Sequence, residues 1–317
     1  MSETREKVGQ PGWRERLPLI ERAVGSIRPG DGPKPARQQS APAPARPPAG
    51  STQAAHTTSA PAASHQGPVA ARTSRYAEID LERLKELGIL TPDSGRSRIQ
   101  EEFRVIKRGI LQHAFDRNAR NPGLPGNLVM VTSAKQNEGK TFTAVNLAIS
   151  IALERDYTVL LVDGDFARPS VLNTLGLESK KGMIDILEDP SIDMADVMIR
   201  TNIDKLSILP AGSLHHLSTE LLASHQMSKL VTDIAQRYHD RIVIFDAPPI
   251  LETSEPCALA MHVGQVIMVV EAEKTPKSAV KEALSMIDTG ARLGVVLNRC
   301  SSRAQQAQFG AYYRNAK

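Results

Sequence analysis

The sequence predicts an α/β fold in which helices cover both faces of a mostly parallel sheet, preceded by a disordered Pro/Ala-rich N-terminal region. From about residue 76 onward, short apolar runs rich in β-forming residues alternate with longer helical segments. Such alternation is typical of βα units joined into a parallel sheet. The runs are apolar almost without interruption, as strands covered on both faces usually are.

The predicted strands follow a Pro- and Gly-containing break near residue 125. They comprise residues 128–133, 158–163, 206–211, 241–246, 265–271 and 293–298. Two amphipathic helices are expected before the first strand, over residues 79–90 and 97–115. In the second helix one face carries Ile99, Phe103, Ile106 and Ile110.

The chain divides into four predicted segments. Residues 29–75 are rich in Pro, Ala, Ser, Thr and Gln and nearly free of large apolar side chains, so we expect a disordered linker. Residues 1–28 contain a short amphipathic helix over 17–27, which is either a docking peptide for a partner or membrane surface, or a frayed terminus. Residues 76–303 would form the folded domain, and residues 304–317 a flexible C-terminal tail.

The positive charge lies outside the predicted domain. The formal net charge is +4, and residues 1–75 hold eleven Lys/Arg against five Asp/Glu. We therefore expect no nucleic-acid partner. No apolar run could span a bilayer and the start lacks the apolar stretch of a signal peptide, which predicts a soluble cytoplasmic protein. Cys257 and Cys300 have neither disulfide nor metal-site spacing and are expected to be small buried hydrophobes.

A phosphate-binding loop follows the first predicted strand. The stretch Ala134-Lys-Gln-Asn-Glu-Gly-Lys-Thr141 matches a P-loop with alanine at the first glycine position. Backbone N–H groups of such a loop, together with the N-terminus of the next helix, bind phosphate oxygens. Lys140 would reach the β- and γ-phosphates, and the Thr141 hydroxyl would bind Mg²⁺. An apolar strand before the loop and an amphipathic helix after it are the context that this motif requires.

Three carboxylates are expected at the same edge of the sheet. Asp163 and Asp165 end the second predicted strand in "TVLLVDGD", and Asp246 ends a later one in "RIVIFDAPP". Ligands of open α/β sheets bind beyond the carboxyl ends of the strands. One such carboxylate alone would be interpreted as a helix N-cap, but three of them beside a P-loop favour a Mg²⁺–nucleotide site.

The P-loop and the two aspartate motifs together resemble the bacterial tyrosine kinases, P-loop proteins related to the MinD/ParA ATPases. The resemblance covers roughly residues 76–317. The stretches "IDLERLKELGIL…RVIKRGIL" and "DGDFARPS" are similar to the stand-alone subtype found beside exosortase (PEP-CTERM) exopolysaccharide loci. That subtype implies a cytoplasmic, self-associating kinase that is activated by a separate membrane polysaccharide co-polymerase and is recruited to the inner face of the cell membrane. ATP, Mg²⁺ and a cognate phosphatase are implied as well.

The resemblance also implies roles for individual residues. Asp163 and Asp246 would join Thr141 around the metal, and Asp165 would orient or deprotonate the attacking hydroxyl. The nucleotide-contacting positions would be Ala134, Gln136, Asn137, Glu138, Gly139, Lys140, Thr141, Phe142, Arg168 and Asn298. Arg168 would contact either phosphate or a neighbouring subunit, and Asn298 is either an adenine contact or an ordinary turn residue.

Three positions depart from the family pattern. The helix motif ExxRxxR, linked to ring-like self-association, is Glu101-x-x-Arg104-x-x-Lys107 here, and lysine is a poorer bidentate partner than arginine. Arg168 lies one place later than usual. Lys135 occupies the position of the additional lysine of the MinD/ParA P-loops, which supports the alternative of a partition or positioning ATPase without kinase activity.

Two tyrosines lie side by side in the C-terminal tail. Tyr312 and Tyr313 are two of only five tyrosines in the chain. A tyrosine autokinase would need such residues, so we expect them to accept phosphate from the site of a second copy, with Tyr76 in the linker as an alternative acceptor. A scaffold that binds nucleotide without catalysis is the third possibility, disfavoured because the Walker residues that a nucleotide site needs, such as Lys140 and Thr141, are intact.

Overall fold

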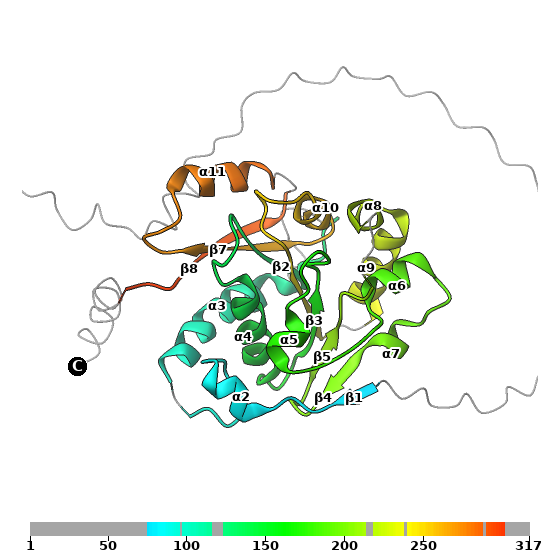
Figure 1. Ribbon diagram of the computed structural model, residues 1–317, viewed down its shortest axis with the longest axis horizontal. Helices are drawn as coiled ribbons and strands as arrows, with labels where there is room; N and C mark the ends of the chain where they lie inside the picture. Colours follow the sequence, from blue (N-terminus) through cyan, green and yellow to red (C-terminus); the bar gives the residue numbers. More distant parts are fainter. Residues whose placement is uncertain are drawn as a thin grey trace, which may run out of the picture. The chain divides into compact units, whose positions relative to one another are not determined.

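The computed structural model describes residues 75–95, 97–115, 123–213, 218–237, 240–287 and 290–301. Within these ranges an eight-stranded sheet runs in the order β1-β4-β5-β3-β6-β2-β7-β8 (Figure 1). The strands are β1 Arg75–Ala77, β2 Leu128–Ser133, β3 Thr158–Asp163, β4 Ile199–Thr201, β5 Leu206–Leu209, β6 Arg241–Asp246, β7 Gln265–Glu271 and β8 Arg292–Asn298. All neighbours pair in parallel except β4 and β5.

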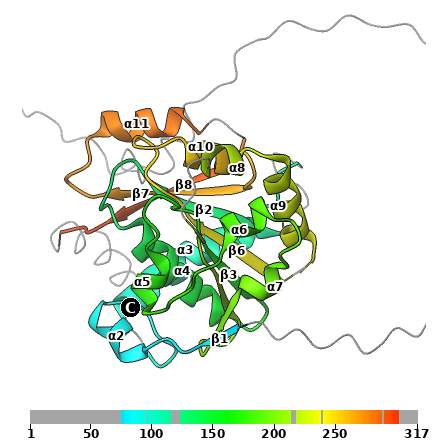
Figure 2. The same ribbon diagram turned by 45° about the vertical axis from the view of Figure 1, so that its right-hand side comes forward.

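Helices cover both faces of the sheet (Figure 2). One face packs against α2 (Leu81–Glu86), α3 (Arg98–Ala114), α4 (Lys140–Ala152) and α5 (Val171–Leu175). The other packs against α6 (Met183–Glu188), α7 (Met194–Val197), α8 (Ser218–Leu222), α9 (His225–Arg237), α10 (Glu255–Ala260) and α11 (Lys277–Ser285). The predicted fold class is therefore confirmed.

The predicted segments at the two ends of the chain lie largely outside the described residues. These are the docking segment 1–28, the linker as far as residue 74, and the tail 304–317 with Tyr312 and Tyr313. Among the helices that the structure describes, none has the length and apolar character needed to cross a bilayer.

Several element boundaries differ from the prediction for local reasons. β5 ends at Leu209, two residues early, because the carbonyls of Pro210 and Ala211 accept N–H groups from the start of α6. The predicted helix 79–90 is only α2, which begins after the N-cap Asp80 and is followed by Gly88 at φ 69°. The three-residue strands β1 and β4 were not predicted, since they are too short to show a periodic pattern.

Tyr76 and the two cysteines also lie elsewhere than expected. Tyr76 belongs to the edge strand β1 rather than to the linker, and its side chain is 62% exposed. Cys257 and Cys300 are both of intermediate exposure, so the expectation that both are buried was wrong.

The predicted burial of the last strand, β8, also has to be corrected. Its apolar sequence predicted a strand covered on both faces, and β7 beside it is buried over six of its seven residues. In β8, by contrast, five of seven residues are exposed and the other two are partly buried. β8 lies at the end of the strand order, so among the described residues it has a neighbouring strand on one side only.

Helix α3 has the predicted apolar stripe, but one of its charged residues has an unexpected place. Phe103 and Ile110 are buried, as expected. Lys107, the third position of the predicted self-association motif, is only 8% exposed. Its ammonium donates to the carbonyl of Ser150 at 2.7 Å and pairs with Glu154 at 2.7 Å. Lys107 therefore holds the C-terminal turn of α4 within its own chain, and its side chain is largely buried.

Replacing Lys107 with methionine should destabilise the domain. Lys107→Met keeps most of the side-chain volume but leaves the Ser150 carbonyl and Glu154 without their cation. We expect a loss of about 1–3 kcal/mol in the free energy of unfolding, measured by urea titration of the full chain. Arg104→Met is the matched control, because Arg104 makes only a half-exposed pair with Glu101 at 2.6 Å and should cost less than about 1 kcal/mol. Equal losses in both variants would contradict this role of Lys107.

Candidate active site

The chemically reactive side chains converge at the carboxyl edge of the sheet, as predicted. Asp163 ends β3, Asp246 ends β6, and the two are direct neighbours in the register of these parallel strands. The P-loop follows β2. Strand β2 pairs with β6 on the side of β6 that is opposite to β3. The three segments therefore meet at one edge of the sheet because their strands are adjacent and point the same way.

The P-loop presents the N-terminus of α4 to this edge. Gly139 is the N-cap of the helix at φ 94°, a left-handed conformation that favours glycine, and no side chain caps the first turn. Uncapped N–H groups at a helix N-terminus attract anions, because the helix dipole places partial positive charge there. The loop is therefore suited to hold phosphate.

Four side chains brace the loop from other segments or from within it. Glu138 is buried; its carboxylate accepts the N–H of Lys135 at 2.8 Å and the hydroxyl of Thr275. Glu252, from the loop after β6, accepts the N–H of Gln136 at 2.9 Å. Asn298, at the end of β8, donates its amide to the Glu138 carbonyl at 2.8 Å.

The amide of Asn298 also explains why residue 139 is glycine. A Cβ on Gly139 would lie 2.0 Å from Asn298 Nδ2, which is closer than any real contact. Asn298 is therefore more than the ordinary turn residue that the sequence left as one alternative. It is a structural contact of the P-loop, whatever else it touches.

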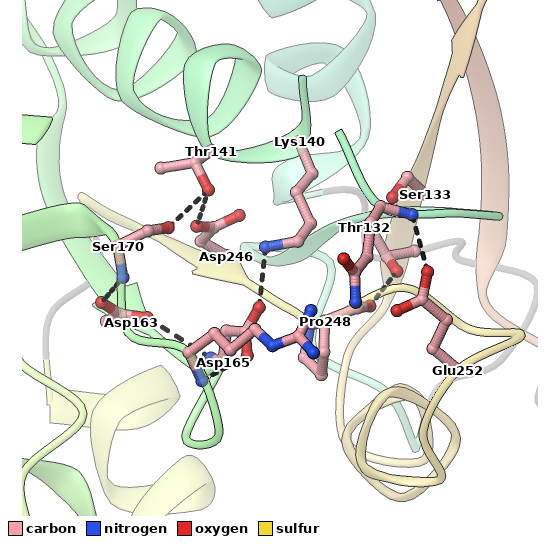
Figure 3. A network of polar contacts seen from close by, with 12 residues as sticks. Thr132, Ser133, Lys140, Thr141, Asp163, Asp165, Ser170, Asp246, Pro248 and Glu252 are labelled. Carbon is pink, nitrogen blue, oxygen red and sulfur yellow. Dashed lines mark hydrogen bonds and ion pairs between the residues drawn. The ribbon is translucent and has the colours of Figure 1, made fainter. Parts of the chain in front are cut away.

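Lys140 and Asp165 form the central ion pair of the site. The Lys140 ammonium lies 2.8 Å from Asp165 Oδ2, and both side chains are largely buried (Figure 3). Burial alone would lower the pKa of Lys140, but attraction by Asp246 and Asp165 outweighs it, so the pKa is raised above its ordinary value. The lysine is therefore a permanent cation at this edge.

Thr141 and Asp246 form a second polar contact. The Thr141 hydroxyl donates to Asp246 Oδ2 at 2.6 Å and lies 2.8 Å from the hydroxyl of Ser170 (Figure 3). The other carboxylate oxygen of Asp246 is buried and has no hydrogen-bond partner in the described structure. A buried carboxylate oxygen without a partner is costly, and a cation beside it would remove that cost.

Asp163 organises the loop that carries Asp165. Its Oδ2 accepts the N–H groups of Ser170 and Val171, each at 3.0 Å. Its Oδ1 accepts the N–H of Asp165 at 3.3 Å. These bonds fold residues 163–171 into a turn in which Asp165 points back towards Lys140.

Burial makes the two strand-end carboxylates reluctant to ionise together. It raises the pKa of Asp163 to about 7, and the neighbouring Asp246 adds to the shift. It also raises the pKa of Asp246 to about 6, against the attraction of Lys140. Two buried acids on adjacent strands with raised pKa values form a site whose negative charge a divalent cation would stabilise.

These residues fit Mg²⁺ held jointly with phosphate. Magnesium usually takes one or two carboxylates, with phosphate oxygens and water as its remaining ligands. Thr141 Oγ1 and the unpartnered oxygen of Asp246 supply protein ligands of that kind. Within the described ranges there is no cluster of three His, Cys, Asp or Glu that could bind a metal without such help.

The remaining predicted site residues are more peripheral. Arg168 has an exposed side chain, and its N–H donates to Asp165 Oδ1 at 3.1 Å. The ring of Phe142 packs towards Phe103, with ring centroids 6.5 Å apart, and belongs to the core between α3 and α4. Lys135, Gln136 and Asn137 are exposed on the P-loop, and Ala134 is buried beneath it.

Sequence reasoning missed three contacts of the site. Ser170 lies in the quoted stretch "DGDFARPS" but received no role. Glu252 and Thr275 each follow a strand of the same sheet by a few residues, in loops at the carboxyl edge. Their position after strands at the carboxyl edge was the only signal available in the sequence. Their partners are a backbone N–H and a P-loop carboxylate, and no sequence motif describes such contacts.

A protein-family model and named relatives both match this chain. A family model described as "AAA domain" matches residues 126–292, more than half of the sequence. Tyrosine-protein kinase YwqD of Bacillus subtilis is 30% identical over 214 residues, which is 67% of this chain and 85% of that protein. Putative tyrosine-protein kinase CapB of Staphylococcus aureus is 27% identical over 209 residues, 65% of this chain and 87% of that protein.

Solved structures show the same fold. The chimerical protein CapA2B2 is 26% identical with a TM-score of 0.59, covering 73% of this chain and 95% of its own. The VpsO kinase domain is 28% identical with a TM-score of 0.51, covering 65% of this chain and all of its own. Together with the P-loop, the Lys140–Asp165 pair and the Thr141–Asp246 contact, these matches are decisive. The chain belongs to the bacterial tyrosine-protein kinases that are built on a P-loop AAA domain.

Proposed function

We propose that this kinase transfers the γ-phosphoryl group of ATP to Tyr312 and Tyr313 of a second copy of itself. The observation that carries the proposal is the convergence of one cation, one hydroxyl and two carboxylates beside the free N-terminus of α4. The Lys140–Asp165 contact of 2.8 Å and the Thr141–Asp246 contact of 2.6 Å are joined into one network through Ser170 and Asp163. Phosphoryl transfer depends mostly on positioning and charge neutralisation, which this network provides.

The residues of the chain divide this work. The N–H groups at the start of α4 and the Lys140 ammonium hold phosphate oxygens. Thr141 and Asp246 would hold Mg²⁺, which when bound would supply charge neutralisation at the phosphates, while Asp163 orders the adjoining turn. A lysine ammonium has three N–H donors, so Lys140 can bind phosphate while keeping Asp165 beside it.

Asp165 is the residue placed to assist the attacking hydroxyl. Tyrosine has a pKa of about 10, so its hydroxyl is a weak nucleophile at neutral pH. A carboxylate beside the phosphate would accept the proton of the tyrosine hydroxyl as the new P–O bond forms and the bond from the γ-phosphorus to the β–γ bridging oxygen breaks, with ADP leaving. Asp165 Oδ1 already accepts the N–H of Arg168, which fixes the carboxylate in place.

The assignment of the acceptor residues, the kinase subtype and the partners is based on the sequence. Tyr312 and Tyr313 lie outside the described residues, and each phosphate would add roughly two negative charges there. We infer that the kinase belongs to the exosortase-associated subtype and regulates exopolysaccharide synthesis. A membrane polysaccharide co-polymerase would activate it and recruit it to the inner face of the membrane, and a phosphatase would reverse the reaction.

Self-association would bring the tail of one copy to the site of another. Glu101 and Arg104 are half-exposed on α3, where they pair with each other. They remain available to a neighbouring copy, unlike Lys107. We infer that any contact between copies through α3 relies on these two residues.

A partition-type ATPase is the alternative, and one observation favours it. Lys135 is exposed on the P-loop, where the corresponding MinD/ParA lysine is found. Such an ATPase would release phosphate to water and would place none on tyrosine.

Substitutions of Lys140 and Lys135 distinguish a tyrosine kinase from a partition-type ATPase. Lys140→Met should reduce phosphotyrosine on the full chain by roughly 10²–10³-fold, because it removes a donor to the transferred phosphate. Mass spectrometry after incubation with Mg²⁺–ATP measures it. Lys135→Met, in the same loop but exposed, should keep most of the phosphotyrosine. Free phosphate without phosphotyrosine, lost on Lys135→Met, would establish the ATPase instead.

The tail tyrosines can be tested separately from the kinase. Tyr312→Phe/Tyr313→Phe removes only two hydroxyls and should erase most phosphotyrosine from the chain, as mapped by mass spectrometry. Tyr76→Phe is the matched control and should leave the signal unchanged. A signal that survives the tail substitution but disappears with Tyr76→Phe would show that the acceptor is in β1.

Asn298→Ala separates the two roles considered for that residue. If Asn298 braces the P-loop, affinities for ATP and GTP should fall by the same factor, about 3–10-fold for one lost hydrogen bond. If it reads adenine, ATP affinity should fall while GTP affinity stays constant. Calorimetric titration with each nucleotide in the presence of Mg²⁺ makes the measurement, and we expect the parallel fall.

A further inference from the structure

Strand β8 carries a row of uncovered aliphatic side chains. Leu293, Val295 and Leu297 are 39%, 37% and 58% exposed. They alternate along the strand and therefore share one face of the sheet. In the register with β7 they lie beside Val266, Met268 and Val270, which are all buried in the core under α10 and α11. We call these three residues the β8 stripe.

The β8 stripe extends a core face beyond the last helix that covers it. On β7 that face is closed by α11, where Ala283 and the following Ile287 are buried. None of the described residues closes it over β8. Single exposed aliphatics are ordinary on protein surfaces, but a continuous row on an edge strand marks an interaction site. The strand is as apolar as its buried neighbours, which indicates that it is normally covered.

The chain itself supplies a segment in the right place. The strands β2, β3, β6 and β7 are each followed by a helix of the fold, namely α4, α5, α10 and α11. β8 ends at Asn298, and residues 302–317 follow, outside the described residues. As a helix these sixteen residues would span about 24 Å, and the seven residues of β8 span about 23 Å. The segment can therefore run back along the whole strand.

The sequence of this segment has an apolar face that matches the stripe. Phe309, Tyr312, Tyr313 and Ala316 have the spacing i, i+3, i+4 and i+7, which places them on one side of a helix. On the same helix Arg303 and Arg314 would lie about 120° and 140° around the axis from Phe309, away from this face. The two expected phosphoacceptors would thus lie on the face that contacts β8.

We propose that residues 302–317 dock on the β8 stripe of their own chain and bury Tyr312 and Tyr313 there. A phosphate on either tyrosine adds a doubly charged group that cannot be buried against Leu293, Val295 and Leu297 without a counter-charge. Phosphorylation would therefore prevent the segment from docking again. The docking itself is independent of the proposed kinase activity; only the release by phosphorylation rests on it.

Photocrosslinking of the full chain tests the docking. We would place p-benzoylphenylalanine at position 309 or, as the matched control, at position 308, about 100° away on a helix. The protein is treated with a tyrosine phosphatase, kept without ATP and irradiated at dilute concentration. Adducts between position 309 and residues 290–299 of the same chain should form at least tenfold more often than from position 308.

Two tail substitutions complete the design. In the position-309 background, Tyr312→Glu/Tyr313→Glu should lower the adduct yield about tenfold, and Tyr312→Phe/Tyr313→Phe should leave it unchanged. The proposal would be overturned by equal yields from positions 308 and 309 or by adducts outside β8. Adducts between chains would also overturn it, because they would mean that a second copy covers the stripe. Failure of the kinase would appear differently, as absent phosphotyrosine with these adducts intact.

Discussion

The concentration of buried negative charge at the carboxyl edge of the sheet is the constraint on which the site depends. Asp163 and Asp246 end neighbouring strands, and Asp165 lies two residues beyond the first of them. Buried carboxylates are unfavourable without partners. Lys140 provides the cation inside the protein, the turn after β3 provides N–H groups, and one oxygen of Asp246 is left for a further positive ligand. The same charges that would hold Mg²⁺ and phosphate therefore also decide how the surrounding loops fold.

The P-loop is positioned by contacts with segments at the ends of three other strands as well as by its own residues. Glu138 joins it to Thr275 after β7, Glu252 joins it to the loop after β6, and Asn298 joins it to the end of β8. Two of the braces come from βα connections at the same edge, and the third comes from the end of β8. A shift in any of these loops would consequently move the N-terminus of α4, and with it Lys140 and Thr141. Such an arrangement keeps the phosphate-binding groups fixed at the positions that transfer requires.

The sequence predicted the elements whose pattern is local, and missed those that depend on tertiary contacts. Strands β2, β3, β6 and β7 begin and end where predicted, because each is a continuous apolar run, and parallel strands bring Asp163 and Asp246 together automatically. Lys107 appeared to be a surface residue, because helical spacing alone does not show that its ammonium reaches the end of α4. Glu252 and Thr275 received no role for the same reason, although both follow strands at the carboxyl edge. β8 was predicted to be covered because it is as apolar as the buried strands. Its composition does not reveal which neighbouring segment would supply the cover.

β8 connects the nucleotide site to the tail that the kinase is proposed to modify. Asn298 is the last residue of the strand and braces the P-loop, while Leu293, Val295 and Leu297 on the same strand form the stripe. A segment docked on that stripe would stabilise an edge strand that the described residues cover poorly. It would thereby also hold Asn298 against Gly139. Under the docking proposal, the state of the tail and the order of the P-loop are linked through one strand, and by reciprocity nucleotide binding would favour the docked tail.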